Sequence, residues 1–226
     1  MEKDIYTSGL ISFIIQLITI IVDTYALTLP IHPKFYGIKV LLWIEYIINF
    51  IEFGFYSWML NNFSIINNIT KYRYYDWIIT TPTMLFTYSM YLLTIRKIEE
   101  NKEYNLFNLI DNEKYKLITI ILLDWTMLFF GYISELGMIN AKISTFLGFI
   151  PFIIMFYIIY ENYAKYSSLG INTFIYFVSV WGLYGIAALM NYNTKNIMYN
   201  ILDLFAKNFF ALFLAYVLIY KYAYDN

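Results

Sequence analysis

Seven apolar stretches, each close to the length that crosses a lipid bilayer, constrain this chain more than any other feature. They cover residues 9–29, 40–60, 74–95, 117–133, 143–160, 171–190 and 197–220, of which the fourth and fifth are short. A helix needs about 20 mostly apolar residues to cross the hydrocarbon core, where every backbone amide must bond internally. The connections are too short for a second domain. We therefore predict that residues 1–226 form one all-α membrane domain, a bundle of seven transmembrane helices.

Composition excludes several other classes of protein. The chain is 61% hydrophobic and 14% charged, which is more apolar surface than a soluble domain of this length can bury. The net charge of -1 provides no basic patch for nucleic acid, so none is expected as a partner. Cysteine is absent and His32 is the single histidine, which argues against a thiolate or histidine metal site. The start, "MEKDIYTSG", lacks the basic region of a secretory signal, so the first span is expected to be retained.

Basic residues predict the orientation of the bundle. The first, third and fifth loops and the C-terminus contain Lys34, Lys39, Arg96, Lys97, Lys102, Lys114, Lys116, Lys165 and Lys221. The opposite side contains only Lys3, Lys71, Lys142 and Lys195. Since short basic loops remain in the cytoplasm, we expect an extracellular N-terminus and a cytoplasmic C-terminus. This architecture is shared by receptors, channels and pumps.

The third span carries ionisable residues, which are costly in lipid and are by default functional. Arg73, Asp76, Thr80 and Thr87 follow one another at spacings of 3, 4 and 7, so they share one face of a helix. An arginine near the outer end of a span could instead extend its guanidinium to the membrane surface. The third span is therefore predicted to present a polar face to the interior of the bundle.

The seventh span carries Asp203 and Lys207, four residues apart. The plain interpretation is a structural ion-pair network between the third and seventh spans. Lys207 lies about midway along its span, however, where its amine cannot easily reach water. A lysine amine also condenses with an aldehyde, and the resulting protonated Schiff base needs a counter-ion. An aldehyde chromophore on Lys207, balanced by Asp76 and Asp203, is the chemical alternative.

Two motifs, "RYYDWIITTP" in the third span and "LDLFAK" in the seventh, resemble those of the microbial (type 1) rhodopsins. The resemblance covers the whole chain in the number and order of helices. It implies a photoreceptor with all-trans retinal bound covalently to Lys207. Asp76 would be the proton acceptor and primary counter-ion, and Asp203 the second counter-ion. Arg73 would be the outward-side arginine, and Thr80 would bond the acceptor.

The same resemblance implies the residues that line the retinal. They are Trp77, Thr81, Met84, Met127, Gly131, Trp181 and Tyr184. Each of them alone could be ordinary helix packing, and the interpretation depends on their occurrence together with the lysine motif. Gly185 stands where many relatives have proline, and Ala188 where many have tryptophan. We expect these two departures to alter the shape of the pocket and the absorption colour.

One position argues against a bacteriorhodopsin-like pump. Such pumps have a carboxylic acid as cytoplasmic proton donor where this chain has Thr87, and a threonine cannot reload a proton as an acid can. Residues 191–200, at the outer end of the last spans, contain no acid that could release protons. Chloride pumping is disfavoured because Asp76 occupies the position that the anion would fill.

The second span favours a cation path. Glu45 and Glu52 lie seven apart on one face, and a line of carboxylates and amides can replace the hydration oxygens of a cation. Either glutamate could instead be neutral and only hydrogen-bonded. The chain looks most like viral rhodopsin group one, which are light-gated cation channels. That resemblance implies a central gate of Ser12, Glu52 and Asn208, and a cytoplasmic constriction containing Glu45 and Asp124. On this interpretation Glu52 acts in the path, separately from the counter-ions.

We therefore predict a retinal photoreceptor that acts as a light-gated channel for monovalent cations or protons. The alternatives are an outward proton pump that uses another donor, a photosensor and a non-photochemical transporter. None of these converts a substrate covalently, so an enzyme is not expected. The lipid bilayer of a host cell or a virus is the expected location, with Phe35 and Tyr36 of the first loop at its surface. Relatives commonly assemble, which makes a homo-oligomer an expectation as well.

Overall fold

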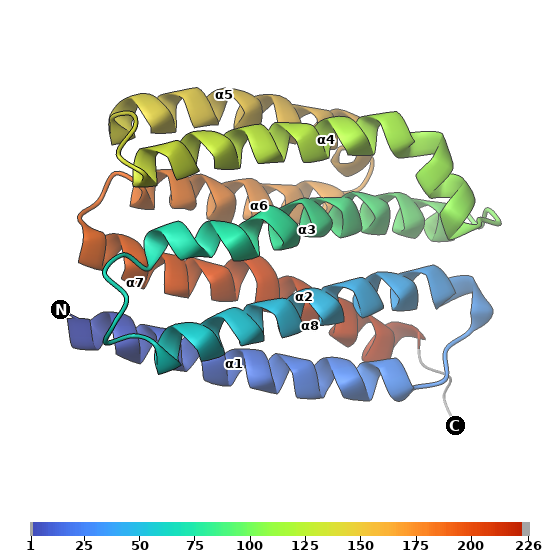
Figure 1. The fold of residues 1–226 in the computed structure, drawn as a ribbon. Coiled ribbons are helices and arrows are strands. Elements are labelled where there is room, and N and C mark those ends of the chain that lie inside the picture. The colour runs from blue at the N-terminus through green and yellow to red at the C-terminus, as the bar shows by residue number, and fades with distance from the viewer. Residues whose placement is uncertain (1, 223–226) are drawn as a thin grey trace.

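The computed structural model describes residues 2–222, which form a bundle of seven long helical rods (Figure 1). The first six rods are α1 (Glu2–Thr28), α2 (Tyr36–Asn61), α3 (Thr70–Glu99), α4 (Leu106–Glu135), α5 (Ala141–Ile159) with its extension η2 (Tyr160–Ala164), and α6 (Ser168–Ala187). The last rod consists of α7 (Tyr192–Asp203), η3 (Leu204–Asn208), α8 (Phe209–Val217) and η4 (Leu218–Tyr222). A short helix, η1 (Pro33–Phe35), joins α1 to α2. The predicted seven-helix architecture is confirmed.

The fourth rod differs most from its predicted length. The apolar stretch 117–133 suggested a short helix after a long polar loop, but α4 begins at Leu106 and has 30 residues. Asn105 starts the helix because its side chain accepts hydrogen bonds from the backbone N–H groups of Phe107 and Asn108. The polar turns of α4 extend beyond the apolar part of the bundle, and a hydropathy pattern cannot detect them.

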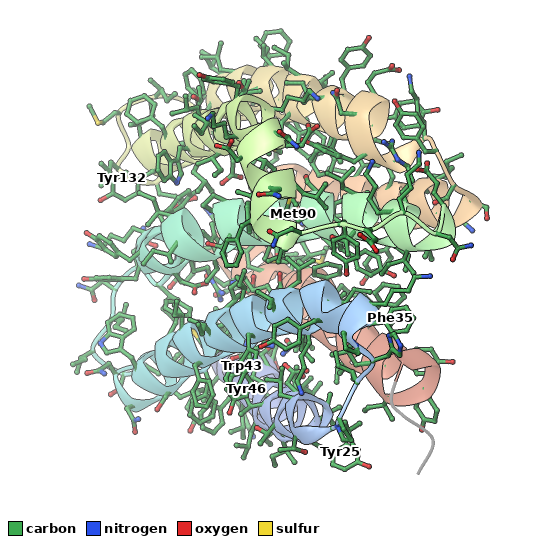
Figure 2. All side chains as sticks on the ribbon, turned by 90° about the vertical axis from the view of Figure 1, so that its right-hand side faces the viewer. Tyr25, Phe35, Trp43, Tyr46, Met90 and Tyr132 are labelled. Carbon is green, nitrogen blue, oxygen red and sulfur yellow. The ribbon has the colours of Figure 1, made fainter. Side chains whose placement is uncertain are left out.

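Six of the helices in the described part of the chain are long and apolar enough to cross a membrane. The remaining rod, α2, carries Glu45, Asn49 and Glu52 on its buried face. Large apolar side chains cover the outside of the bundle, as Tyr25 of α1 illustrates by pointing away from its neighbours (Figure 2). Apolar outside and polar inside is the arrangement of a multi-pass membrane protein.

The central helix, α3, is held to α4 at Pro82. Proline has no N–H group, so the carbonyl of Ile78, one turn earlier, lacks its usual helical donor. The indole Nε1 of Trp125 in α4 donates to this carbonyl at 3.0 Å. A neighbouring helix thus satisfies the free backbone group, as hydrocarbon surroundings require.

A π-helical turn, η3, interrupts the last rod at Leu204–Asn208. The N–H group of Phe209 donates to the carbonyl of Leu204, five residues earlier, and the hydroxyl of Tyr176 in α6 donates to the carbonyl of Phe205 at 2.6 Å. Single π-turns inside helices are frequent at functional sites. This one contains Lys207, and Asp203 directly precedes it.

Candidate functional site

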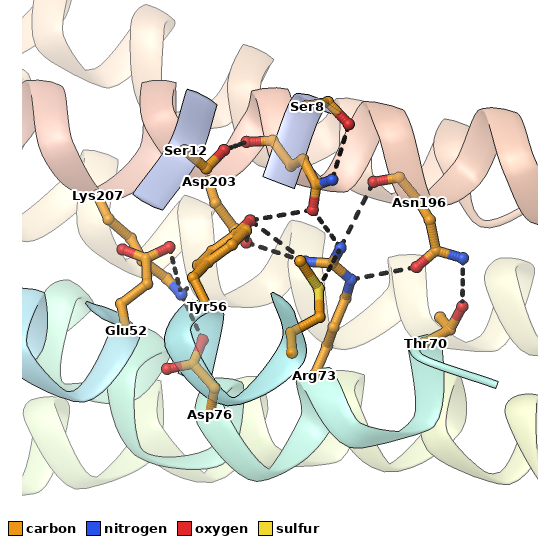
Figure 3. Close-up of polar contacts among 12 residues, drawn as sticks. Ser8, Ser12, Glu52, Tyr56, Thr70, Arg73, Asp76, Asn196, Asp203 and Lys207 are labelled. Atoms are coloured by element: carbon orange, nitrogen blue, oxygen red, sulfur yellow. Dashed lines mark hydrogen bonds and ion pairs between the residues drawn. The ribbon is translucent and has the colours of Figure 1, made fainter. Parts of the chain in front are cut away.

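The amine of Lys207 lies among three carboxyl groups in the interior of the bundle (Figure 3). Its Nζ donates a hydrogen bond to Asp76 Oδ2 of α3 at 2.6 Å. It also forms ion pairs with Glu52 Oε1 of α2 at 3.2 Å and with Asp203 Oδ1 at 3.8 Å. Side chains from α2, α3 and the last rod therefore converge on one nitrogen atom.

Arg73 supplies the second cation of this cluster. Its guanidinium is fully buried and does not reach the membrane surface, which rules out the surface alternative. Nη1 forms an ion pair with Asp203 Oδ2 at 3.3 Å, and Nε donates to Asn196 Oδ1 at 3.3 Å. Nη2 donates to the side chain of Asn200 (Figure 3). A buried arginine with these partners is fixed in place and stabilises the charge of Asp203.

Asp203 has two further donors that fix its orientation. The hydroxyl of Tyr56 donates to its Oδ2 and the hydroxyl of Tyr184 to its Oδ1, both at 2.7 Å. Tyr184 was predicted for the site, whereas Tyr56 was not. Tyr56 follows Glu52 by four residues, so the shared helix face was the signal that could have identified it. Two cations and three carboxyl groups form the cluster, which can therefore hold one more proton without becoming positively charged.

Lys207 also lines a cavity between α3, α4, α5, α6 and the last rod. The cavity contains about 920 Å³ of empty space, part of it open to the outside. Its walls include all the predicted lining residues, namely Trp77, Thr81, Met84, Met127, Gly131, Trp181 and Tyr184. They also include residues that the sequence analysis missed, namely Tyr74, Leu128, Ser134, Glu135, Ala141, Ser144, Thr145, Gly148, Phe149, Phe152, Tyr199 and Ala206. The walls are mainly apolar and aromatic, as in sites for apolar ligands.

The family model described as "Bacteriorhodopsin-like protein" matches residues 4–220. The chain belongs to this family of microbial rhodopsins. Among solved structures, viral rhodopsin OLPVRII is 26% identical, with a TM-score of 0.81 and coverage of 94% of this chain and 96% of that one. Acetabularia rhodopsin I is 18% identical (TM-score 0.75, coverage 96% and 94%), and the bromide-bound form of halorhodopsin from Halobacterium salinarum is 17% identical (TM-score 0.74, coverage 97% and 96%). No curated protein matches the chain.

Rhodopsins of this family normally bind retinal through a lysine, and the site in this member fits that group. Lys207 lines a mainly apolar cavity, and carboxyl groups balance the charge of its amine. A long apolar aldehyde requires both features. Both the cavity and the lysine motif are therefore compatible with retinal.

The two departures at the pocket, Gly185 and Ala188, both line the cavity of this rhodopsin. A Cβ atom at Gly185 would lie 2.6 Å from Cζ of Phe149 in α5. The aromatic ring therefore occupies space next to the position where many relatives have proline. The expected change in pocket shape has a defined cause here, because glycine allows Phe149 to pack closely against α6.

Two predicted residues have contacts that differ from those expected. The hydroxyl of Thr80 donates to the main-chain carbonyl of Asp76 at 3.0 Å, and not to its carboxyl group. Asp124 accepts a hydrogen bond from Thr81 at 2.8 Å, and Thr81 lines the cavity. Its helix, α4, packs against α3 and α5, and the described hydrogen bonds do not join Asp124 to Glu45, so their common constriction stays a prediction.

The remaining predicted path residues lie between α1, α2 and the last rod. Glu45 accepts a hydrogen bond from Thr87 of α3. Ser12 donates to the carbonyl of Asn200 at 2.8 Å, and Asn208 donates to Thr19 at 3.2 Å. The three expected gate residues, Ser12, Glu52 and Asn208, thus lie along one interface without direct hydrogen bonds to each other among the described contacts.

Proposed function

We propose that this rhodopsin is a light-gated cation channel with all-trans retinal bound covalently to Lys207. Retinal would supply the absorption of light and an isomerisation next to the Lys207 nitrogen. The outward N-terminus that the basic loops predict would place the Arg73 side of the cluster outside. The residues of the chain would supply proton transfer, gating and the route for ions.

One observation carries the channel proposal, namely a line of buried polar atoms that lack hydrogen-bond partners within the described residues. The line extends from Lys207 along α1, α2 and η3. It comprises both amide atoms of Gln16, Oδ1 of Asp23, Oδ1 of Asn49, Oε2 of Glu52 and Oδ1 of Asn208. Buried polar groups are normally satisfied by protein or by ordered water, and a polar interior site holds water where there is room. We infer a hydrated route suitable for a monovalent cation.

Glu52 couples this route to the reaction at Lys207. A proton on Nζ can pass to Asp76 at 2.6 Å, which removes the positive charge that attracts Glu52 at 3.2 Å. Loss of this attraction frees the Glu52 side chain to move, while the same residue forms part of the polar line.

A second candidate function, an outward proton pump, is favoured by the contact between Glu45 and Thr87. The donor position of the third span has no acid, but Thr87 donates a hydrogen bond to the carboxyl group of Glu45 from α2. This acid could therefore supply the proton that Thr87 cannot. The polar line toward α1 favours the channel, because a pump requires no continuous polar route.

Illumination under voltage clamp tests the proposal. Cells that express the protein with retinal should show a photocurrent that reverses where the cation gradient balances the voltage. The Lys207→Ala variant serves as the control and should show no photocurrent. A current that remains outward at every voltage in symmetrical solutions would establish the pump and exclude the channel.

A further inference from the structure

A second pair of charges adjoins the retinal cavity, away from the cluster at Lys207. Glu135 at the end of α4 and Lys195 in α7 form an ion pair, with Oε1 and Nζ 2.5 Å apart. Their side chains are only 10% and 12% exposed. In Figure 1, α4 and α7 lie on opposite sides of the layer formed by α3 and α6. The pair therefore extends across the end of the cavity, and the proposed channel cycle makes no use of it.

The two charges of this pair are not equivalent with respect to the cavity. Glu135 is one of the lining residues, as is Ser134 before it in the chain, whereas Lys195 is not. Lys195 precedes Lys207 by twelve residues, which corresponds to about 18 Å along a helix. The end of the cavity away from the Lys207 amine thus has a carboxylate toward its interior and an ammonium group behind it.

We propose that the Glu135–Lys195 pair sets the absorption wavelength, an inference that rests on the proposed attachment of retinal to Lys207. When a conjugated chain on a protonated nitrogen absorbs light, positive charge moves from the nitrogen toward the far end of the chain. A carboxylate at that end stabilises the excited state more than the ground state, and an ammonium group does the opposite. Because Glu135 lies nearer the cavity than Lys195, the pair as a whole shifts absorption to longer wavelength.

Absorption spectra of the purified protein, loaded with all-trans retinal at mildly alkaline pH, test this role. Glu135→Gln should shift the maximum to shorter wavelength and Lys195→Gln to longer wavelength. Each shift should be on the order of 5 nm, as Coulomb's law gives when part of an elementary charge moves roughly 10 Å from a fixed charge. The absorption maximum of the double variant should lie between those of the two single variants. Glu135→Asp keeps the charge, so its maximum should remain near that of the parent protein.

Two controls separate colour from structure. Lys142→Gln removes an exposed cation at the same end of the bundle and should leave the maximum unchanged. Thermal unfolding of the retinal-free variants measures how far the ion pair stabilises the fold. If both single variants lose stability while their absorption maxima shift in the same direction or do not shift, the pair is only a structural link and the proposal fails. If the parent protein forms no visible band, the retinal attachment fails and this role with it.

Discussion

Replacement of Arg73 should lower the free energy of unfolding of the bundle. The burial and geometry of its ion pair with Asp203 determine the size of this loss. The guanidinium is fully buried and lies 3.3 Å from Asp203. Breaking a buried ion pair by removing one partner costs about 3–5 kcal/mol because the other charge is left uncompensated. Asp203 keeps two tyrosine donors at 2.7 Å, so Arg73→Met should fall in the lower part of that range, at about 3–4 kcal/mol. For a chain of this length that corresponds to a fall in Tm of roughly 6–16 °C.

Thermal unfolding of the retinal-free protein in detergent, followed by circular dichroism, measures this loss. The retinal-free form keeps the result independent of any chromophore. The double variant Arg73→Met/Asp203→Asn should lose less stability than the sum of the single variants, by at least about 1 kcal/mol, because the orphaned charge is gone. Additive losses would mean that the two residues are not coupled.

An exposed ion pair provides the matched control. Lys114 pairs with Asp111 at 2.8 Å on the surface of α4, where the two side chains are 46% and 72% exposed. Removal of such a surface partner costs about 0–1 kcal/mol. If Arg73→Met costs no more than Lys114→Met, the arginine is not a buried structural cation and the reasoning is refuted.

Three further outcomes follow from the site. Lys207→Ala should abolish the visible band of the retinal-treated protein, and a band that persists would contradict covalent attachment there. Asp76→Asn should shift the absorption maximum to longer wavelength. Glu52→Gln should produce a smaller shift of the same sign, because its carboxyl group is 3.2 Å from Nζ instead of 2.6 Å. An unchanged spectrum in Glu52→Gln would support the predicted separation of the ion path from the counter-ions. Asp124→Asn should leave the reversal potential of the photocurrent unchanged, because Asp124 bonds to Thr81 beside the cavity and not to a residue of the polar line. An altered potential would support the predicted place of Asp124 in the ion path.

Spacing along single helices predicted much of the site. Asp76 shares a helix face with Arg73, and Asp203 lies one turn before Lys207, so helical periodicity alone predicted that each pair faces the same side of its helix. The retinal-lining residues came from the resemblance, and all of them line the cavity. Positions within one helix depend only on a fixed geometry, so the two pairs, unlike the lining residues, were predicted without knowledge of the bundle or of a family.

Contacts between helices were predicted less well, and η3 shows why. A π-turn adds one residue to a helical turn, which rotates everything after it by about 100° relative to a regular helix. Asn208 ends η3 and donates to Thr19, so a regular helical wheel would not have found this partner. The proximity of Glu52 to Lys207 depends likewise on how α2 is rotated in the bundle. The residue pattern of α2 alone does not determine how this helix is rotated in the bundle.

The two sides of the Lys207 cluster differ in how far their polar groups have hydrogen-bond partners. In the proposed channel, this difference would place the barrier to ions on the Arg73 side. On the side toward Asp23, the polar line contains unpartnered atoms. On the Arg73 side, the side-chain amides of Asn196 and Asn200 both donate and accept hydrogen bonds. Water entering that side must displace protein hydrogen bonds, whereas on the other side it satisfies groups that already lack partners. In the proposed channel, opening would therefore require that the network around Arg73 breaks. Glu52 contacts Lys207 between the two sides and would transmit the loss of charge at that amine.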